Sequence, residues 1–259
     1  MTRPSIQAAV ALVTGALILA ACGPTTPSKP ELTDPREIIA AAAAEAAAAP
    51  GVHIDASLDG SLTIDLLGLG GGGAPVDLSG STAAVDLAIA SGDARVTFAL
   101  ASVLRGELRT VGGVSYLKTT IGGARYGILA GGTVIGTKAL PAALEAILTA
   151  MDAPGLTPVK GDDVPCGSAT CYRVTLSLRL DDLADLGTGL AAALPPSLAD
   201  AAIDLAIDVT RDTNDLASLE AVISQADGST LTLVASFSKW DQTVTVEPPP
   251  GDEIAPPGG

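Results

Sequence analysis

The chain has 259 residues, and 14 Lys and Arg against 29 Asp and Glu give it a formal net charge of −15. This charge argues against binding of nucleic acid and against binding of anionic lipid through a polybasic segment. Hydrophobic residues make up 47% of the chain and aromatic residues only 2%. The composition therefore predicts one large domain or two small ones, with a core built from Ala, Val, Leu and Ile.

The first 21 residues have the features of a secretory signal peptide. Arg3 precedes an uncharged apolar run from Ile6 to Ala20, which is too short and too poorly flanked for a spanning helix. The run ends in Leu19-Ala20-Ala21-Cys22, which resembles the lipobox of bacterial lipoproteins at all four positions. The resemblance implies cleavage before Cys22, acylation of its thiol (diacylglycerol, palmitate), and anchoring on the extracytoplasmic face of the cell membrane. An ordinary signal peptide with a chance cysteine is the alternative.

The next segment predicts a tether followed by a helix. Residues 23–35 are rich in Pro, Thr and Ser, so residues 22–36 are assigned to the lipidated N-terminus and its extended linker. Asp34 predicts a helix N-cap, with Pro35 at the first helical position. An alanine-rich helix then runs to Ala49. Its short side chains would allow very close contact with another surface or a ligand.

From Val52 onward, apolar residues alternate with polar ones. This period of two is typical of antiparallel strands with one dry face and one wet face. Glycine and aspartate punctuation between the runs predicts turns. The alternating runs are residues 52–58, 62–66, 85–89, 96–100, 172–180, 203–209 and 231–237.

Two further helices are predicted, at residues 139–151 and, more weakly, at 180–194. Eight or more strands with one long apolar face need a cover. We therefore predict an α+β fold: a curved antiparallel β half-barrel with helices covering its concave apolar face. Residues 37–247 would form this single domain, and the Pro/Gly-rich residues 248–259 would be a disordered tail.

Helices rich in small residues can cover such a face without filling it. The sequence therefore predicts an apolar cavity, although a fully packed core would produce the same alternation. The residues expected to line the cavity are Val85, Leu87, Ile89, Val96, Phe98, Leu100, Leu144, Ile147, Leu148, Leu176, Leu178, Ile203, Leu205 and Ile207.

The remaining two cysteines, Cys166 and Cys171, are separated by four residues that include Gly167. This spacing favours a disulfide across a tight turn, in keeping with an oxidising compartment. A redox pair would have the C-x-x-C spacing, and a zinc site would need more ligands than the single histidine, His53, can supply. We expect no metal and no cofactor.

Motifs that would indicate an enzyme are weak or lack their context. Gly68–Gly73 satisfies G-x-G-x-x-G, but no helix opens there to hold a pyrophosphate. Asp55–Gly60 imitates the start of a calcium loop, but Leu66 occupies the position that needs a glutamate. His53 lies on the polar side of its strand, and the chain has no G-x-S-x-G. The prediction is a protein that is not an enzyme.

Four stretches carry a resemblance to a known family: Gly112–Lys118, Cys171–Thr175, Ile207–Leu219 and Phe237–Pro249. In this order, behind a lipobox and around a helix at 139–151, they resemble the LppX/LprG type of bacterial lipoprotein, which has the LolA-like half-barrel fold. Members of that family hold acyl chains of lipids or glycolipids between sheet and helices and carry them across the envelope. The resemblance thus implies a lipid or glycolipid ligand, the bilayer as a partner through Cys22, and an envelope transport partner of unknown identity.

The chain departs from this family in its few aromatic residues, its glycine run at 70–73 and its cysteine pair. Two alternatives follow from the same residues. One is a non-catalytic envelope interaction module whose core is filled. The other is a surface hydrolase, which the single histidine disfavours.

Overall fold

The computed structural model describes residues 30–64, 74–101, 103–129, 139–153, 155–179 and 200–256. The chain divides into two compact units, Met1–Glu31 and Leu32–Gly259, and the second contains every described helix and strand. Because these elements share their own core, residues 32–259 are expected to fold without the first unit. The predicted signal peptide, Cys22, most of the tether and the helix predicted at 180–194 lie outside the described residues.

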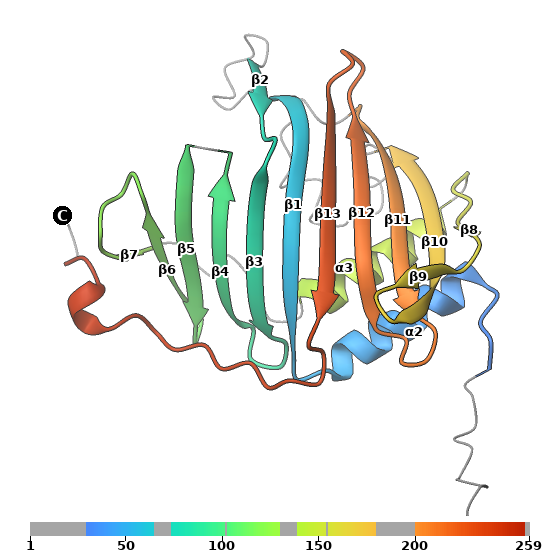
Figure 1. Ribbon diagram of the computed structural model, residues 1–259, viewed down its shortest axis with the longest axis horizontal. Coiled ribbons are helices and arrows are strands. Elements are labelled where there is room, and N and C mark those ends of the chain that lie inside the picture. The colour runs from blue at the N-terminus through green and yellow to red at the C-terminus, as the bar shows by residue number, and fades with distance from the viewer. Residues whose placement is uncertain are drawn as a thin grey trace, which may run out of the picture. The chain divides into compact units, whose positions relative to one another are not determined.

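The second unit contains one open sheet of thirteen described strands, and every strand pair in it is antiparallel (Figure 1). The strands are β1 (Gly51–Ile64), β2 (Ala74–Asp77), β3 (Ser81–Ala88), β4 (Asp93–Leu100), β5 (Leu104–Val111), β6 (Val114–Thr119), β7 (Gly127–Ile128), β8 (Val159–Lys160), β9 (Val164–Cys166), β10 (Ala169–Arg179), β11 (Ala202–Thr210), β12 (Leu216–Ser224) and β13 (Thr230–Ser238). The main order is β7-β6-β5-β4-β3-β1-β13-β12-β11-β10-β8, with β2 paired to β1 and β9 paired to β10. The predicted antiparallel α+β architecture is confirmed.

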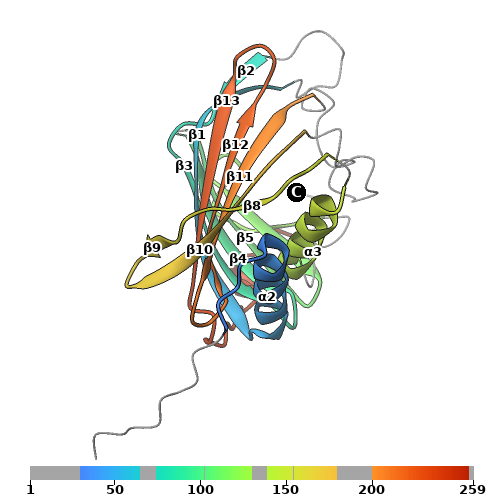
Figure 2. The same cartoon turned by 90° about the vertical axis from the view of Figure 1, so that its right-hand side faces the viewer.

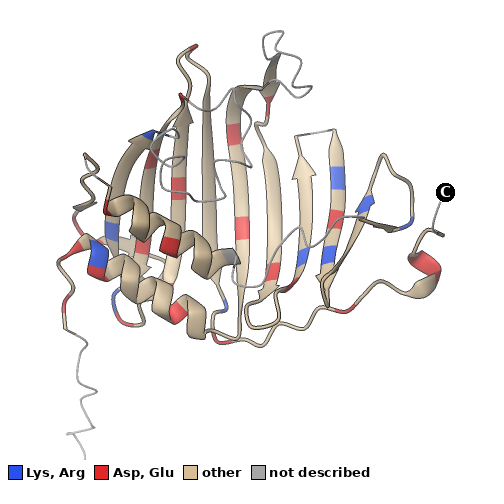
Figure 3. Cartoon of the chain, turned by 180° about the vertical axis from the view of Figure 1, so that it is seen from behind, with Lys and Arg blue, Asp and Glu red and all other residues tan. Residues whose placement is uncertain are grey.

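Two α-helices lie on the same face of the sheet (Figure 2). They are α2 (Pro35–Ala48) and α3 (Ala139–Met151), and α2 begins as predicted, with Asp34 accepting a hydrogen bond from the Arg36 amide at 2.8 Å. Seen from behind the sheet, both helices cross the half that contains β10 to β13, and neither lies in front of β4 to β6 (Figure 3). No helix in the described part of the chain is long and apolar enough to span a membrane.

The core lies between these helices and the sheet. Ile38 and Ile39 of α2 are fully buried, and the alanines that follow allow the helix to approach the strands and α3 closely. Arg36 of α2 forms a salt bridge with Asp152, the residue that follows α3. Tyr172 on β10 is buried, and its hydroxyl accepts a hydrogen bond from the Leu32 amide at 3.1 Å.

The C-terminal segment differs from the disordered tail predicted at residues 248–259. After β13, the Trp240 indole donates to the Leu216 carbonyl at 3.0 Å. The chain then runs along one end of the sheet to the 3-10 helix η3 (Gly251–Glu253) (Figure 1). There the Tyr126 amide donates to the Glu253 carbonyl at 2.7 Å, and the Ala255 amide donates to the Tyr126 carbonyl at 2.8 Å. These main-chain bonds order a segment whose composition alone predicts disorder; residues 257–259 lie outside the described residues.

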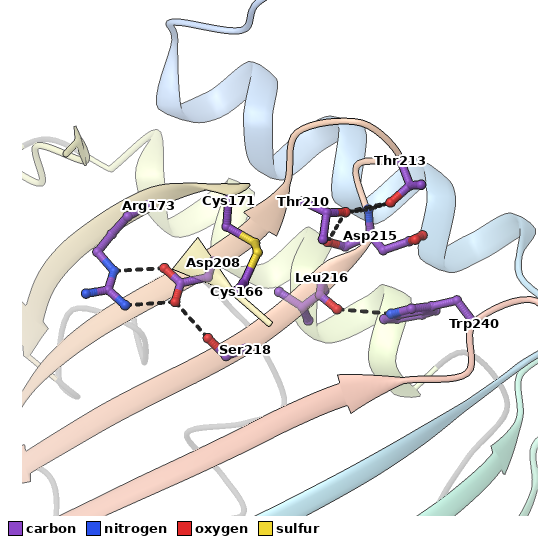
Figure 4. Close-up of a disulfide and its surroundings, with 10 residues drawn as sticks. All are labelled: Cys166, Cys171, Arg173, Asp208, Thr210, Thr213, Asp215, Leu216, Ser218 and Trp240. Atoms are coloured by element: carbon purple, nitrogen blue, oxygen red, sulfur yellow. Dashed lines mark hydrogen bonds and ion pairs between the residues drawn. A yellow bond between two sulfur atoms is a disulfide. The ribbon is translucent and has the colours of Figure 1, made fainter. Parts of the chain in front are cut away.

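The predicted disulfide between Cys166 and Cys171 closes the β9–β10 hairpin (Figure 4). The two Cα atoms are 5.9 Å apart. Gly167 makes the turn possible because its φ of +63° lies in the left-handed region. The bond ties the short strand β9 to β10.

We expect the double change Cys166→Ser and Cys171→Ser to lower the free energy of unfolding by about 2 kcal/mol, the chain-entropy value for so short a loop. Denaturant unfolding of the oxidised protein checks this value. Ser168→Ala, which alters the same turn and keeps the bond, is the matched control. Equal stability of the double variant and the oxidised wild type would contradict the prediction.

Candidate functional site

The strand register identifies the side chains that share the helix side of the sheet. Directly opposed residues of an antiparallel pair lie on the same face. Ile54, Val85 and Phe237 pack against the core, so their cross-strand partners share that face. The row that contains them is Phe237, Ile54, Val85, Val96, Leu108 and Leu117. The neighbouring row is Val174, Ile207, Leu219, Ala235, Ala56, Ala83 and Phe98.

Burial of this apolar face changes from one half to the other. In the half crossed by the helices, Leu176 is 3% exposed, and Ile207 and Leu144 are 1% exposed. Toward β4 to β6, Val96, Phe98 and Leu117 on the same face are half-buried and Leu100 is 38% exposed, whereas Leu108 is buried. The face therefore extends beyond the part that α2 and α3 close off.

Most residues predicted to line a cavity come together on this face. Six belong to the main core cluster and five more pack against it, whereas three lie further along the sheet. The core members are Leu87, Ile89, Leu144, Leu176, Leu178 and Ile207, the packed ones are Val85, Ile147, Leu148, Ile203 and Leu205, and the outlying ones are Val96, Phe98 and Leu100. Their role as cavity lining stays a prediction.

Several residues of the same face were absent from the predicted lining. Ala56 and Ala83 are directly paired and place two short side chains at its centre. Further along this row, Phe98 lies over Gly106, where an added Cβ would come within 2.5 Å of the Phe98 ring. Alternation along each strand marks these positions as inward, but only the cross-strand register shows that the small residues form one row.

The opposite face of the sheet is polar. His53 lies there, with Nδ1 at 2.6 Å from an Asp86 carboxylate oxygen and Nε2 at 3.4 Å from one of Asp55. An open hollow of about 660 Å³ occupies this face and is lined from β1, β3, β4, β5 and β13. Among the described residues, no group of His, Cys, Asp and Glu is arranged to hold a metal ion.

A charged network joins β10, β11 and β12 on the polar face (Figure 4). Nε and Nη2 of Arg173 donate to the two carboxylate oxygens of Asp208, both at 2.8 Å, and the Ser218 hydroxyl donates to Asp208 at 2.8 Å. The hydrogen bond to Asp208 raises the pKa of Arg173. Because the Asp208 side chain is only 8% exposed, these bonds compensate its burial and hold the three strands together.

A second group of ion pairs joins β4 and β5. The Nε atoms of Arg95 and Arg109 are 2.9 and 2.6 Å from one carboxylate oxygen of Glu107. Burial by itself raises the pKa of Glu107, but the hydrogen bonds and charges of Arg109 and Arg95 outweigh it, and the net pKa lies below the ordinary value.

No known family model and no curated protein sequence matches the chain. Its fold is similar to those of two solved mycobacterial proteins. The first is the lipoprotein LppX of Mycobacterium tuberculosis, with a TM-score of 0.50 and 13% identity over 82% of this chain and 98% of that one. The second is LprF of Mycobacterium bovis, with a TM-score of 0.51 and 14% identity over 84% of this chain and 97% of that one. The predicted resemblance to the LppX/LprG type is thus confirmed as a likeness of fold.

The lowered pKa of Glu107 makes stability depend on pH. Its ion pairs contribute fully above the unfolded-state pKa of about 4.3 and are lost as pH falls through the folded-state value. We expect Glu107→Gln to lower the free energy of unfolding by about 1 kcal/mol at neutral pH. The difference from wild type should shrink below about pH 4. Urea unfolding at several pH values measures both effects, with Asp59→Asn, an exposed acid on β1, as the control; a difference that does not vary with pH would contradict this.

Proposed function

We propose that this chain is a lipoprotein anchored through Cys22 on the extracytoplasmic face of the cell membrane. In this proposal it binds the acyl chains of a lipid or glycolipid on the helix side of its sheet and carries or presents them within the cell envelope. No catalytic step is needed, because the ligand is held by its hydrocarbon. The observation that carries the proposal is the mismatch between the apolar face and its helical cover.

The mismatch follows from the dimensions of the elements. A helix rises 1.5 Å per residue, so the 14 residues of α2 span about 21 Å. Eleven strands lie on the main path of the sheet, and at about 4.8 Å per strand they span about 48 Å. The two described helices cross the same half and therefore leave the half-buried Val96 and Leu117 beyond them.

Ala56 and Ala83 support a binding role at the centre of the sheet. Their methyl groups leave depth above the strands, while Val85 and Leu58 rise on either side of the alanine row. Burial of a dozen methylenes of an acyl chain there contributes about 10 kcal/mol before the costs of immobilising it. Specificity would then depend on the length of the free face and on polar groups at its margin.

Two observations support this proposal. The fold is similar to that of the lipoprotein LppX, and the predicted lipobox would give this chain a lipid anchor of its own. Two or more acyl chains hold a protein on a bilayer where a single chain does not. A non-catalytic envelope interaction module is the alternative function. The tight packing of Leu176, Ile207 and Leu144 beneath the helices favours it.

Blocking the alanine row tests lipid binding. We expect Ala83→Leu to weaken uptake of a fluorescent fatty-acyl probe by about tenfold or more, because the added carbons displace two or three methylenes of the ligand. The measurement is a probe titration of residues 30–259, together with mass spectrometry of organic extracts of the purified protein.

Ala84→Leu is the matched control, because Ala84 is the next residue of β3 and strand alternation places it on the opposite face of the sheet. It should bind the probe as the wild type does. Absence of lipid from the extracts together with no probe uptake by the wild type would refute the lipid-binding role and favour the interaction module. Equal effects of the two substitutions would refute this location for the ligand.

A further inference from the structure

The overall charge hides a basic segment. Residues 94–129 contain five cationic side chains and a single acidic one, Glu107, a net charge of +4 in a chain of −15. This segment forms most of β4 and all of β5 to β7, at one end of the sheet. The blue bands on these strands in Figure 3 mark its cations. The cations are Arg95, Arg105, Arg109, Lys118 and Arg125.

Exposed aliphatic side chains lie in the same segment. Val103 and Ile121 are each 75% exposed, the highest value of any large hydrophobic residue described. Val103 belongs to the β4–β5 turn and Ile121 follows β6. The two sites are neighbours, because the Thr120 amide donates to the Arg105 carbonyl at 2.9 Å. Isolated exposed aliphatics are common, but these two lie on adjoining turns and beside the cations of the segment.

An open hollow of about 350 Å³ lies beside these turns and is lined by Arg105, Lys118, Thr119, Thr120 and Gly123 among others. The Arg105 side chain has no ion-pair partner within the described residues. Lys118 lies 3.5 Å from Glu253 and keeps 37% exposure. Glu107 also lines the hollow, but Arg95 and Arg109 already pair with it. The hollow thus offers two cations and threonine hydroxyls, which are suitable partners for a phosphate.

We propose that this end of the sheet docks on an anionic phospholipid bilayer. We define the basic tip as Val103, Arg105, Lys118, Ile121 and Arg125. Val103 and Ile121 enter the interface, while Arg105 and Lys118 bind head-group phosphates in the hollow. A bilayer fits this tip because exposed aliphatic side chains lie beside cations, the combination that binds an anionic membrane surface.

The basic tip also lies at one margin of the apolar face. Leu100 and Leu104 are cross-strand partners that flank the β4–β5 turn. An acyl chain that leaves the bilayer at the tip would meet these leucines and then the row of Val96, Leu108 and Leu117. This step rests on the proposed lipid binding, whereas docking itself does not.

Vesicle co-sedimentation of residues 30–259, without the acyl anchor, tests docking. We expect binding to phosphatidylcholine vesicles that contain phosphatidylglycerol, weaker binding to phosphatidylcholine alone, and loss of binding at high salt. Arg105→Gln should weaken binding about fivefold. The pair Val103→Ser and Ile121→Ser should weaken it about tenfold or more.

Val159→Ser and Arg179→Gln are the matched controls, because Val159 is 53% exposed and Arg179 has a 53% exposed side chain on the other half of the sheet. They should bind as the wild type does. Failure of the wild type to bind anionic vesicles, or equal losses in tip and control variants, would overturn the docking inference. Uptake of the soluble acyl probe separates the docking proposal from the lipid-binding proposal. Tip variants that take up the probe but no longer bind vesicles would support both proposals. A wild-type protein that takes up the probe but does not bind vesicles would overturn docking alone.

Discussion

The pairing of β1 with β13 is the constraint on which the rest of the structure depends. It joins residues 53–60 to 231–238 in continuous register and so unites two antiparallel meanders in one sheet. Because side chains alternate with a period of two, a slip of one residue would turn Ile54, Ala56 and Leu58 to the polar face. His53 and Asp55 would then meet the helices without partners. The single apolar face, and every role proposed for it, exists only in this register.

The sequence predicted the antiparallel α+β class and many of the local elements, but not the order of the strands in the sheet. Alternation identified β1, β3, β4, β10, β11 and β13 but not β5 or β12, and the apolar spacing gave α3 its observed bounds at residues 139–151. The central position of β1 was not predictable, because its neighbour β13 lies far along the chain and no local signal selects it. The order of residues 251–255 likewise comes from bonds to Tyr126, which composition does not report.

The same limit applies to the candidate site. Alternation placed Leu176 and Phe98 on one face, as the strand register does, but it cannot tell which of them a helix covers. Burial depends on where α2 and α3 cross the sheet, and that follows from contacts between distant segments. The basic tip was missed for another reason. A net charge of −15 averages over the chain, whereas the charges of residues 94–129 counted by themselves show the opposite sign.

The two halves of the sheet differ in how firmly they are held. The half with β10 to β13 has both helices, the disulfide, the Arg173–Asp208 pair and the Trp240 hydrogen bond. Losing Arg173 would remove two charged hydrogen bonds from the Asp208 carboxylate, which is only 8% exposed. Together these restraints make this half resist local opening. In the other half, the described helices add no cover to β4–β6. The Glu107 ion pairs and the main-chain bonds of Tyr126 restrain that half instead. The apolar ligand that we propose would use the face beyond the two helices, while the firmly packed half supplies much of the stability of the fold.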